Sequence, residues 1–522
     1  MKALRAAVIG LGVGSTHAQA YQQIPGVELA LLCDTNEERL RAVGERLGVA
    51  GRTTRWQDVV ADASVDVVSV CTPDHMHYEQ AAALIRAGKH VFCEKPMVYD
   101  PSPDTALRQA RSLVELVYEH GVLFGVGNVC RFMPQFAAAA EQARQGKLGE
   151  LFFVESDYIH DMREVFVRTP WRVDPERPQS PIYGGGVHPI DLLRWVAGEA
   201  VEVFAYGNHK TLPEYHQMDN VLISIKFASG CIGKVWVCLG VQQRPHNQIP
   251  FNIYGSQGSI RADSQHAEVR LYIDGMIPGQ NAWATIPITP GESKPVLAEL
   301  QQFADCIRYG RHPLVDVVQG ARTVAIMAAA QASLESGQPV AVQAIPRPRQ
   351  LFMMREDIQP QPLPELPEGY GLRTFQEGDE THWLRICRPE FGMSWDEARL
   401  HEQILDKPWF RPEHMFFATY QGQPVGVATA WQATEEETET GSLHYIAVQP
   451  EHRGKRLGLA LTVAVLNCLA ERGFKRCMLS TDDFRWQAIR LYWGAGFRPH
   501  DVRDELDRRR WENVKRRLAA EE

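Results

Sequence analysis

The stretch Ala6-Ala-Val-Ile-Gly10-Leu-Gly12-Val-Gly14-Ser15 decides the fold of the first part of this chain. A short apolar run leads directly into three alternating glycines, and a helical pattern follows Ser15. Glycines at such a point permit a tight turn and let backbone N–H groups approach a pyrophosphate at the N-terminus of a helix. We therefore predict that Gly10, Gly12, Gly14 and Ser15 bind a dinucleotide.

Strand-like and helical segments alternate around this turn. The strand-like segments are Ala6 to Ile9, Leu29 to Cys33, Val67 to Cys71 and His90 to Cys93. This alternation predicts a doubly wound parallel sheet of the α/β class. The second strand ends in Cys33-Asp34, and an acidic residue there hydrogen-bonds a ribose 2′-hydroxyl while it repels a 2′-phosphate. Asp34 therefore favours NAD over NADP.

Beyond about residue 123 the pattern changes to longer β segments with few helices between them. These segments are Leu151 to Tyr158, Val221 to Phe227 and Cys231 to Cys238. They predict a second domain of the α+β class with an open, mainly antiparallel sheet.

A proline-dense segment marks the clearest boundary. Six prolines between Ala344 and Gly371 forbid a regular helix and favour extended backbone. A new α/β unit follows, with strands near Met415 to Tyr420, Pro424 to Trp431, Ser442 to Val448 and Cys477 to Ser480. Because 522 residues are too many for one core, we expect domains at 1–122, 123–345 and 370–522, with a linker at 346–369.

The bulk composition excludes several classes of function. A net charge of −9 argues against a nucleic-acid-binding surface. The ten cysteines form no CxxC pair, which indicates buried thiols in a reducing compartment, and no metal site is predicted. No apolar run reaches the roughly 18 residues of a membrane span, and the N-terminal segment indicates a strand, not a signal peptide. We expect a cytoplasmic enzyme that acts on a small molecule.

Two further motifs follow the glycine turn. They are Thr72-Pro73-Asp-His-Met-His77 and Glu94-Lys95-Pro96. In this order and spacing they closely resemble the glucose-fructose oxidoreductase, inositol dehydrogenase and MocA (Gfo/Idh/MocA) family, over about residues 3 to 345. The resemblance implies a Rossmann domain in which Thr72, Pro73, His77, Glu94 and Lys95 lie at the cofactor.

Lys95 is the first candidate catalytic residue. It stands at the carboxyl end of a parallel strand, where doubly wound sheets bind ligands, so it can face the substrate beside the nicotinamide. The alternative is a surface salt bridge with Glu94. Pro96 favours the catalytic interpretation because it restricts Lys95 to extended conformations. We also expect a cis Lys95–Pro96 bond.

A second signature, Gly184-Gly-Gly-Val-His188-Pro-Ile-Asp191, resembles the family's H-x-x-D helix. In the family an aspartate usually precedes the histidine by four residues, and the two together handle the hydroxyl proton. Here that position is Gly184. Three alternatives remain: Lys95 and His188 transfer the proton alone, an acid such as Asp157 or Asp161 substitutes, or the domain no longer catalyses. We predict a catalytic role for His188.

The substrate site follows from the same resemblance. In relatives Asn128 to Arg131 and Trp171-Arg172 line the sugar site, so we assign Arg131, Trp171 and Arg172 to substrate binding. Asp191 joins them as a residue that fixes structure. An active domain would pass a hydride from a carbinol carbon to the nicotinamide and yield a keto sugar or keto cyclitol.

The last third of the chain contains a strand, a proline-broken loop and a helix start: Ala447-Val448-Gln-Pro-Glu-His-Arg453-Gly454-Lys455-Arg456-Leu457-Gly458. Successive N–H groups at a helix N-terminus form an anion cradle. The loop resembles the R/Q-x-x-G-x-G/A loop of GNAT acetyltransferases, over about residues 370 to 515. The resemblance implies that Ala447, Val448, Arg453, Gly454, Lys455, Arg456, Leu457 and Gly458 bind acetyl-CoA. Arg456 replaces the middle glycine, which a grip by backbone amides would tolerate.

A partner motif, Leu491-Tyr492-Trp-Gly-Ala-Gly-Phe497, matches the LYxxxGF motif of these acetyltransferases. In relatives this tyrosine protonates the departing thiolate. Arg485 stands where relatives often have an asparagine on the pantetheine arm. We expect the strand before the loop to splay from its neighbour and the Val448 N–H to hold the oxyanion. His444 is a candidate base on that strand, with a structural role as the alternative.

These motifs lead to one main hypothesis and two competing ones. The main hypothesis is a bifunctional enzyme in which an NAD-dependent oxidoreductase acts on a sugar or cyclitol and a GNAT domain acetylates an amine such as an amino sugar. In the second, the first domain is an inactive nucleotide or sugar sensor that regulates the acetyltransferase. In the third, the last domain is only an interaction module. Relatives of the first domain commonly pair through an open sheet face, so we expect a homo-oligomer.

Overall fold

The computed structural model describes residues 3–176, 179–242, 247–273, 283–288, 295–391 and 395–520. The chain divides into two compact units. The first comprises Met1–Arg308 and His312–Arg347, and the second comprises Tyr309–Arg311 and Pro348–Glu522. None of the helices in these described ranges is both long and apolar enough to cross a membrane.

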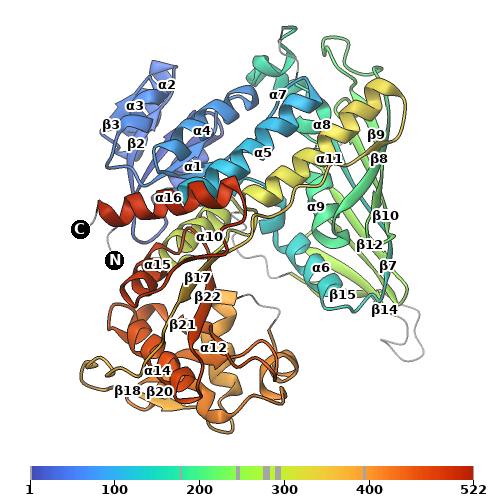
Figure 1. Ribbon diagram of the computed structural model, residues 1–522. Coiled ribbons are helices and arrows are strands. Elements are labelled where there is room, and N and C mark those ends of the chain that lie inside the picture. The colour runs from blue at the N-terminus through green and yellow to red at the C-terminus, as the bar shows by residue number, and fades with distance from the viewer. Residues whose placement is uncertain are drawn as a thin grey trace. The chain divides into compact units, whose positions relative to one another are not determined.

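The first unit begins with the predicted parallel sheet, which has six strands in the described residues (Figure 1). Its order is β3-β2-β1-β4-β5-β6, with β1 Leu4–Ile9, β2 Val27–Cys33, β3 Gly51–Thr53, β4 Val67–Val70, β5 His90–Cys93 and β6 Phe124–Val126. The connecting helices are α1 Gly14–Tyr21, α2 Glu37–Leu47, α3 Trp56–Ala61, α4 His77–Arg86 and α5 Pro103–His120. The order reverses between β1 and β4, and ligands bind doubly wound sheets at such a switch point.

A second sheet completes this unit. Among the described strands its order is β15-β14-β13-β12-β7-β10-β9-β8-β16, and β11 pairs with β7. The strands are β7 Leu151–His160, β8 Ala200–Asn208, β9 Asn220–Phe227, β10 Ile232–Cys238, β11 Asn247–Gln248, β12 Pro250–Gly255, β13 Gly258–Asp263, β14 Glu268–Ile273, β15 Ala284–Pro287 and β16 Val340–Ala341. Its described pairings are antiparallel apart from β7 with β10. The predicted open, mainly antiparallel sheet is confirmed.

The first unit contains further helices and short helical turns. They are η1 Asp74–Met76, η2 Val129–Phe132, α6 Pro134–Arg144, α7 Arg163–Arg168, η3 Pro170–Val173, α8 Pro181–Gly184, α9 Val187–Ala197, α10 Pro295–Tyr309 and α11 Val317–Ser336. Figure 1 shows α11 lying along α5, and these two helices are in contact. The apolar residues of both sheets and of these helices form one continuous buried core.

The second unit contains a third sheet. Its order is β18-β19-β20-β21-β22-β17-β23 in the described residues. The strands are β17 Leu351–Arg355, β18 Tyr370–Thr374, β19 Met415–Tyr420, β20 Gln423–Trp431, β21 Thr440–Val448, β22 Arg476–Thr481 and β23 Arg498–His500. The helices are α12 Glu380–Phe391, α13 Glu397–Leu400, η4 His401–Leu405, η5 Pro412–His414, η6 Pro450–His452, α14 Leu457–Glu471, α15 Trp486–Gly494 and α16 Glu505–Ala519.

The segment predicted as a linker, 346–369, differs from a simple connection. Five of its residues form β17, which pairs antiparallel with both β22 and β23. The proline argument overlooked the apolar run Leu351-Phe-Met-Met354, which lies between two groups of prolines and can pair on both edges. Met353 in its centre is fully buried in the core of the second unit.

We predict that Met353→Ala lowers the stability of the second unit. Truncating a fully buried methionine leaves a cavity and costs about 2–5 kcal/mol. Thermal unfolding of the full-length chain should show the loss in one transition only. Met353→Leu is the matched control, because a volume-conserving change costs less than about 1.5 kcal/mol. Equal stability of the alanine variant and the parent would show that 346–369 is only a linker.

Candidate active sites

The glycine turn lies between the ends of β2 and β4. The N–H of Gly10 donates to the Cys33 carbonyl at 2.8 Å, and Gly10 has a φ of +85°. A Cβ at Gly10 would lie 2.6 Å from the Cys71 carbonyl oxygen, and one at Gly14 would lie 2.9 Å from Val8 Cγ1. Gly12 instead faces open space within 4 Å. The turn is thus closed on the sheet side and open above Gly12, which fits a phosphate that approaches the backbone.

Asp34 lies beside this turn and is 6% exposed. Its carboxylate accepts hydrogen bonds from the N–H groups of Leu11 at 2.7 Å and Asn36 at 2.8 Å. Arg39 approaches the same carboxylate at 3.2 Å. The structure therefore holds the acidic residue against the glycine turn, where it can meet a ribose.

His77 joins the TPxxxH turn to the E-K-P turn. Its two ring nitrogens face the carbonyls of Pro96 at 2.8 Å and Thr72 at 2.9 Å. Burial lowers the pKa of His77, but neighbouring Cys93 and Asp74 outweigh this effect and raise that pKa to about 10. Both partners are carbonyl oxygens, which only accept hydrogen bonds, so both ring nitrogens must carry a hydrogen, as they do in the charged imidazolium. This cation links the TPxxxH turn to the E-K-P turn through two hydrogen bonds.

The Lys95–Pro96 bond is cis, as expected. The Lys95 Nζ donates to the Gly184 carbonyl at 3.0 Å. Burial and the nearby Arg172 lower the pKa of Lys95. Glu94 is not its surface partner: one Glu94 oxygen lies 3.0 Å from His17 Nε2, and the other accepts the backbone N–H of Lys95. The alternative of a surface salt bridge is therefore wrong.

Glu94 remains ionised beside Lys95. Burial raises the pKa of this carboxyl, but the hydrogen bond and charge of His17 outweigh burial and hold the pKa at about 2. The charged carboxylate of Glu94 thus lies against the backbone N–H of Lys95, while the Lys95 amine points toward the Gly184 carbonyl.

His188 is buried on α9, near the same place. Its ring stacks on Tyr158 with centroids 6.0 Å apart, and Nδ1 lies 3.6 Å from Cys130 Sγ. Burial and the charge of Lys95 lower the pKa of His188 to about 3. The imidazole is therefore neutral at ordinary pH. Among the described residues its Nε2 has no hydrogen-bond partner, so this atom can accept a hydrogen bond from a substrate hydroxyl.

Gln179 fills the space beside Gly184. A Cβ at Gly184 would lie 2.7 Å from Gln179 Oε1, so a larger side chain there would displace the glutamine. The Gln179 amide hydrogen-bonds to Arg172 on one side and to the buried Asp74 on the other. The electrostatic influence of Asp74 also favours the charged form of Lys95.

The sequence did not reveal this arrangement. Asp74 lies inside the TPxxxH motif, but its burial depends on the packing of the second sheet's domain. Gln179 belongs to no motif. The two acids suggested as substitutes already have basic partners: Asp157 accepts hydrogen bonds from Lys234 at 2.9 Å, and Asp161 pairs with Arg163 at 2.9 Å.

Arg131 and Asp191 bind each other. Two hydrogen bonds of 2.7 Å join the guanidinium to the carboxylate, and both side chains are at most 3% exposed. Thr323 donates a further bond to Asp191 at 3.0 Å. Breaking a buried pair of this kind is strongly destabilising. The Arg131–Asp191 pair can orient α9 and His188. Because both hydrogen bonds of the Arg131 guanidinium go to Asp191, this group is already occupied. The Arg172 guanidinium instead lies 4.4 Å from the centre of the Trp171 ring, and Arg172 remains partly exposed.

The acetyltransferase loop connects β21 to α14. Arg453 Nε donates to the Val448 carbonyl at 3.0 Å and ties the loop to the strand. Arg456 directly precedes α14 with a φ of +61°, and its side chain is exposed. This left-handed conformation explains why the motif has glycine there, and an L-residue adopts it at a cost of about 1–2 kcal/mol. In the described structure no side chain caps the first turn of α14, so its N–H groups suit a pyrophosphate.

The strand β21 separates from β22 as predicted. The two strands pair only from Thr440 to Ser442, and the remainder of β21 up to Val448 pairs with β20 alone. The free edge leaves backbone groups for the pantetheine amides.

Tyr492 lies on α15 and is 6% exposed. Burial raises the pKa of its hydroxyl to about 12, with a smaller opposing influence from Arg485. The hydroxyl is therefore protonated at neutral pH and can donate a proton. His444 stacks on Trp431 at 5.7 Å, and burial lowers its pKa to about 4, which leaves a neutral imidazole on β21.

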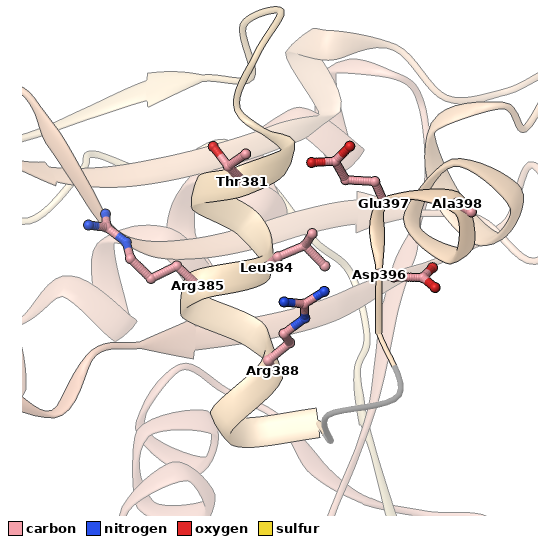
Figure 2. Close-up of a pocket in the computed structure, with 7 residues that line it drawn as sticks. All are labelled: Thr381, Leu384, Arg385, Arg388, Asp396, Glu397 and Ala398. Atoms are coloured by element: carbon pink, nitrogen blue, oxygen red, sulfur yellow. The ribbon is translucent and has the colours of Figure 1, made fainter. Parts of the chain in front are cut away.

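A pocket of about 550 Å³ lies between α12 and the start of α13 (Figure 2). Its lining residues are Thr381, Leu384, Arg385, Arg388, Asp396, Glu397 and Ala398. Figure 2 shows Glu397 and Arg388 reaching into it from opposite sides. The sequence motifs did not mark this pocket.

Comparisons with known proteins agree with this division. Residues 4–128 match the family model for the oxidoreductase family NAD-binding Rossmann fold (GFO_IDH_MocA), and residues 140–342 match the model for its C-terminal alpha/beta domain. The first unit belongs to the Gfo/Idh/MocA family. Residues 381–497 match the model for the acetyltransferase (GNAT) family, so the second unit carries a GNAT domain.

Individual relatives cover one unit each. Myo-inositol 2-dehydrogenase from Thermotoga maritima is 27% identical over 356 residues, which are 66% of this chain and 99% of that protein. Mycothiol acetyltransferase from Thermobispora bispora is 40% identical over 162 residues, which are 29% of this chain and 54% of that protein. The chain thus spans about half the length of that relative. The structure of levoglucosan dehydrogenase with NADH and levoglucosan has a TM-score of 0.60 at 23% identity and covers 66% of this chain and all of that one.

These findings confirm the predicted families, fold and cofactors. The chain combines an oxidoreductase domain that uses NAD with an acetyltransferase domain that uses acetyl-CoA. Gly12 and the N-terminus of α14 offer the open backbone that these two cofactors require.

We predict that Asp34→Ser changes the cofactor preference. Removal of the carboxylate deletes the ribose acceptor and the repulsion of a 2′-phosphate, and it leaves Arg39 without its partner. The dissociation constant for NAD should rise about tenfold or more, while that for NADP falls, as measured by titration calorimetry. Glu28→Ser, at an exposed ion pair on β2, is the control. An unchanged NAD to NADP ratio would contradict the role of Asp34.

Arg172→Gln should shift the pH dependence of alcohol oxidation. A neutral Lys95 accepts the substrate proton, so kcat/KM rises as pH passes upward through the lowered pKa of Lys95. The positive charge of Arg172 lowers that pKa, so its removal raises the pKa and moves the rise to higher pH. Rates of NADH formation against pH measure the shift. Arg168→Gln, an exposed arginine on α7, should not move it.

Proposed function

We propose that this chain is a bifunctional enzyme. Its first unit oxidises or reduces a hydroxyl group of a sugar or cyclitol with NAD, and its second unit transfers an acetyl group from acetyl-CoA to an amine such as an amino sugar. The observation that carries the first activity is the position of Lys95, whose partly buried amine donates to the Gly184 carbonyl and interacts electrostatically with the neutral imidazole of His188. The names of the relatives, which act on inositol and levoglucosan, support a polyhydroxylated ring as the substrate.

The proton path uses two groups of this chain. The neutral amine of Lys95 takes the proton of the substrate hydroxyl, and Nε2 of the neutral His188 accepts a hydrogen bond that orients the same hydroxyl. Trp171 and Arg172 lie toward the substrate. Bound NAD would supply the hydride acceptor. Arg131 and Asp191 hold the helix of His188 in place.

The acetyl transfer uses the splayed edge of β21. The amine attacks the thioester carbonyl, the Val448 N–H stabilises the oxyanion, and Tyr492 gives its proton to the sulfur as the C–S bond breaks. His444 is a candidate to take the amine proton, because its imidazole is neutral and lies on the same strand. Because burial lowers the pKa of His444 to about 4, its imidazole is a weak proton acceptor at neutral pH. We therefore assign Tyr492 as the main catalytic residue of this domain and His444 as a secondary one.

One observation favours a second candidate function for the first unit. Gly184 stands where the family usually has an aspartate, and the Gln179 side chain fills the space that a side chain at this position would need. The Lys95 amine also donates already to the Gly184 carbonyl. A domain that binds NAD or a sugar without turnover would have this arrangement. NAD at 100 times its Kd would raise the free energy of unfolding of such a domain by about 2.7 kcal/mol and so raise its melting temperature, yet the domain would form no NADH from any polyol.

We predict that Lys95→Met lowers NADH formation about 10²- to 10⁴-fold, because a general base is removed. Binding of NAD should persist, and acetyl transfer should not change. The assay uses myo-inositol and levoglucosan as probes. Normal oxidation by the Lys95→Met protein would exclude Lys95 as the base.

In the second unit, Tyr492→Phe should slow acetyl transfer about 10²-fold or more without weakening acetyl-CoA binding. Release of CoA thiol in the presence of D-glucosamine and other simple amines measures the rate, and calorimetry measures binding. Oxidation by this variant should match the parent, which would show two separate sites. A full rate with Tyr492→Phe would exclude Tyr492 as the acid.

A further inference from the structure

β17 comes from the chain before the GNAT domain, yet it lies inside the sheet of that domain. Its five residues pair with Cys477 to Thr481 of β22 on one side and with Arg498 to His500 of β23 on the other. The helix α15 is the connection between β22 and β23. Because neighbouring strands are about 4.8 Å apart, the inserted strand holds the two ends of this connection roughly 10 Å apart.

A side chain next to β17 also reaches the start of α15. Gln350 Nε2 donates to the Asp482 carboxylate at 3.2 Å, and Gln350 Oε1 accepts from the Ser480 hydroxyl at 2.9 Å. The same Asp482 oxygen forms an ion pair with Arg485 at 3.2 Å. Arg485 directly precedes the first residue of α15. Gln350 therefore holds the turn from which the helix begins.

The last residue of β17 reaches the other end of the helix. Arg355 Nη1 donates to the Ala495 carbonyl at 2.8 Å. A cation at this end of a helix satisfies a free carbonyl and interacts favourably with the helix dipole. Gly496 has a φ of +86°, a left-handed conformation that favours glycine, and the Arg355 side chain lies beside it.

Tyr492 lies on this helix, between the two attachments. Its ring packs against Phe497 with centroids 6.0 Å apart, and the Phe497 N–H donates to the Tyr492 carbonyl at 2.9 Å. Rotation or sliding of α15 would move the hydroxyl away from the sulfur that it must reach. A displacement of about 1 Å in a reacting group can cost about 100-fold in rate.

We propose that β17 and the glutamine before it position the acid of the acetyltransferase. Gln350 and Arg355 fix the two ends of α15, so that Tyr492 points at the thioester sulfur. This inference rests on the proposed role of Tyr492 in acetyl transfer. It gives the segment between the oxidoreductase and GNAT domains a part in catalysis in addition to its covalent connection.

The first test measures the helix directly in the full-length protein. Arg355→Met and Gln350→Leu remove one attachment each. Hydrogen exchange of the amides of residues 486–494 should become faster in both variants, while the melting temperature of the second unit falls little. Arg476→Met, an arginine on β22 whose ion pair with Glu356 is 3.9 Å long, is the matched control and should leave α15 unchanged. Unchanged exchange in both variants would overturn the proposal, with or without a known amine acceptor.

The second test is kinetic and uses CoA release with D-glucosamine, or with the fastest amine of the same panel. Arg355→Met should lower kcat about 10- to 100-fold with an unchanged Kd for acetyl-CoA, and Arg355→Lys should restore most of the rate. In a Tyr492→Phe background, Arg355→Met should have almost no further effect, because the group it positions is absent. Equal effects in both backgrounds would overturn the positioning role. A parent-like rate for Tyr492→Phe alone would instead disprove the assignment of the acid, and this inference would fall with it.

Discussion

The contact of Gly10 with the Cys71 carbonyl is the constraint on which the first active site depends. No side chain fits there, since a Cβ would lie 2.6 Å from that oxygen. The glycine turn can therefore close on the end of β4, while its N–H bonds to the end of β2. As a result Asp34 and Thr72 meet the turn at the same edge of the sheet. Lys95, at the end of the next strand, joins them because parallel strands end at a common edge.

Burial then decides the charge of each group at that edge. Lys95 and His188 both lose water, which lowers the pKa of each and favours their neutral forms. Glu94 is largely withdrawn from water as well but remains ionised, because His17 provides a hydrogen bond. The site thus combines a lysine of lowered pKa and a neutral imidazole with the negative charge of Glu94. A lowered pKa makes a lysine a better general base near neutral pH, and a surface lysine would lack this shift.

The acetyltransferase domain depends on a different constraint, the partial separation of β21 from β22. The strands pair for three residues and then diverge, which opens an edge for a pantetheine chain. β22 therefore pairs with β21 along only part of its length. The opposite edge of β22 pairs with all five residues of β17. The boundary between the domains therefore does not coincide with the end of the proline-rich segment. The core of the second unit includes Leu351 and Met353, which lie within that segment.

The sequence alone determined the kind of sheet in each domain, the two cofactor loops and the families, because these follow from local rules. Glycines at turns, alternation of apolar residues and short motifs depend on neighbours within about ten positions. The sequence also placed Lys95, His188 and Tyr492 on the correct elements.

Only the tertiary structure decided the surroundings of these residues. It brought Gln179 against Gly184, 5 positions away in sequence, and linked it to Asp74, 105 positions away. It also placed β17 between two strands more than 120 residues further along. Such contacts depend on how whole domains pack, and no local pattern records which distant side chain fills a space.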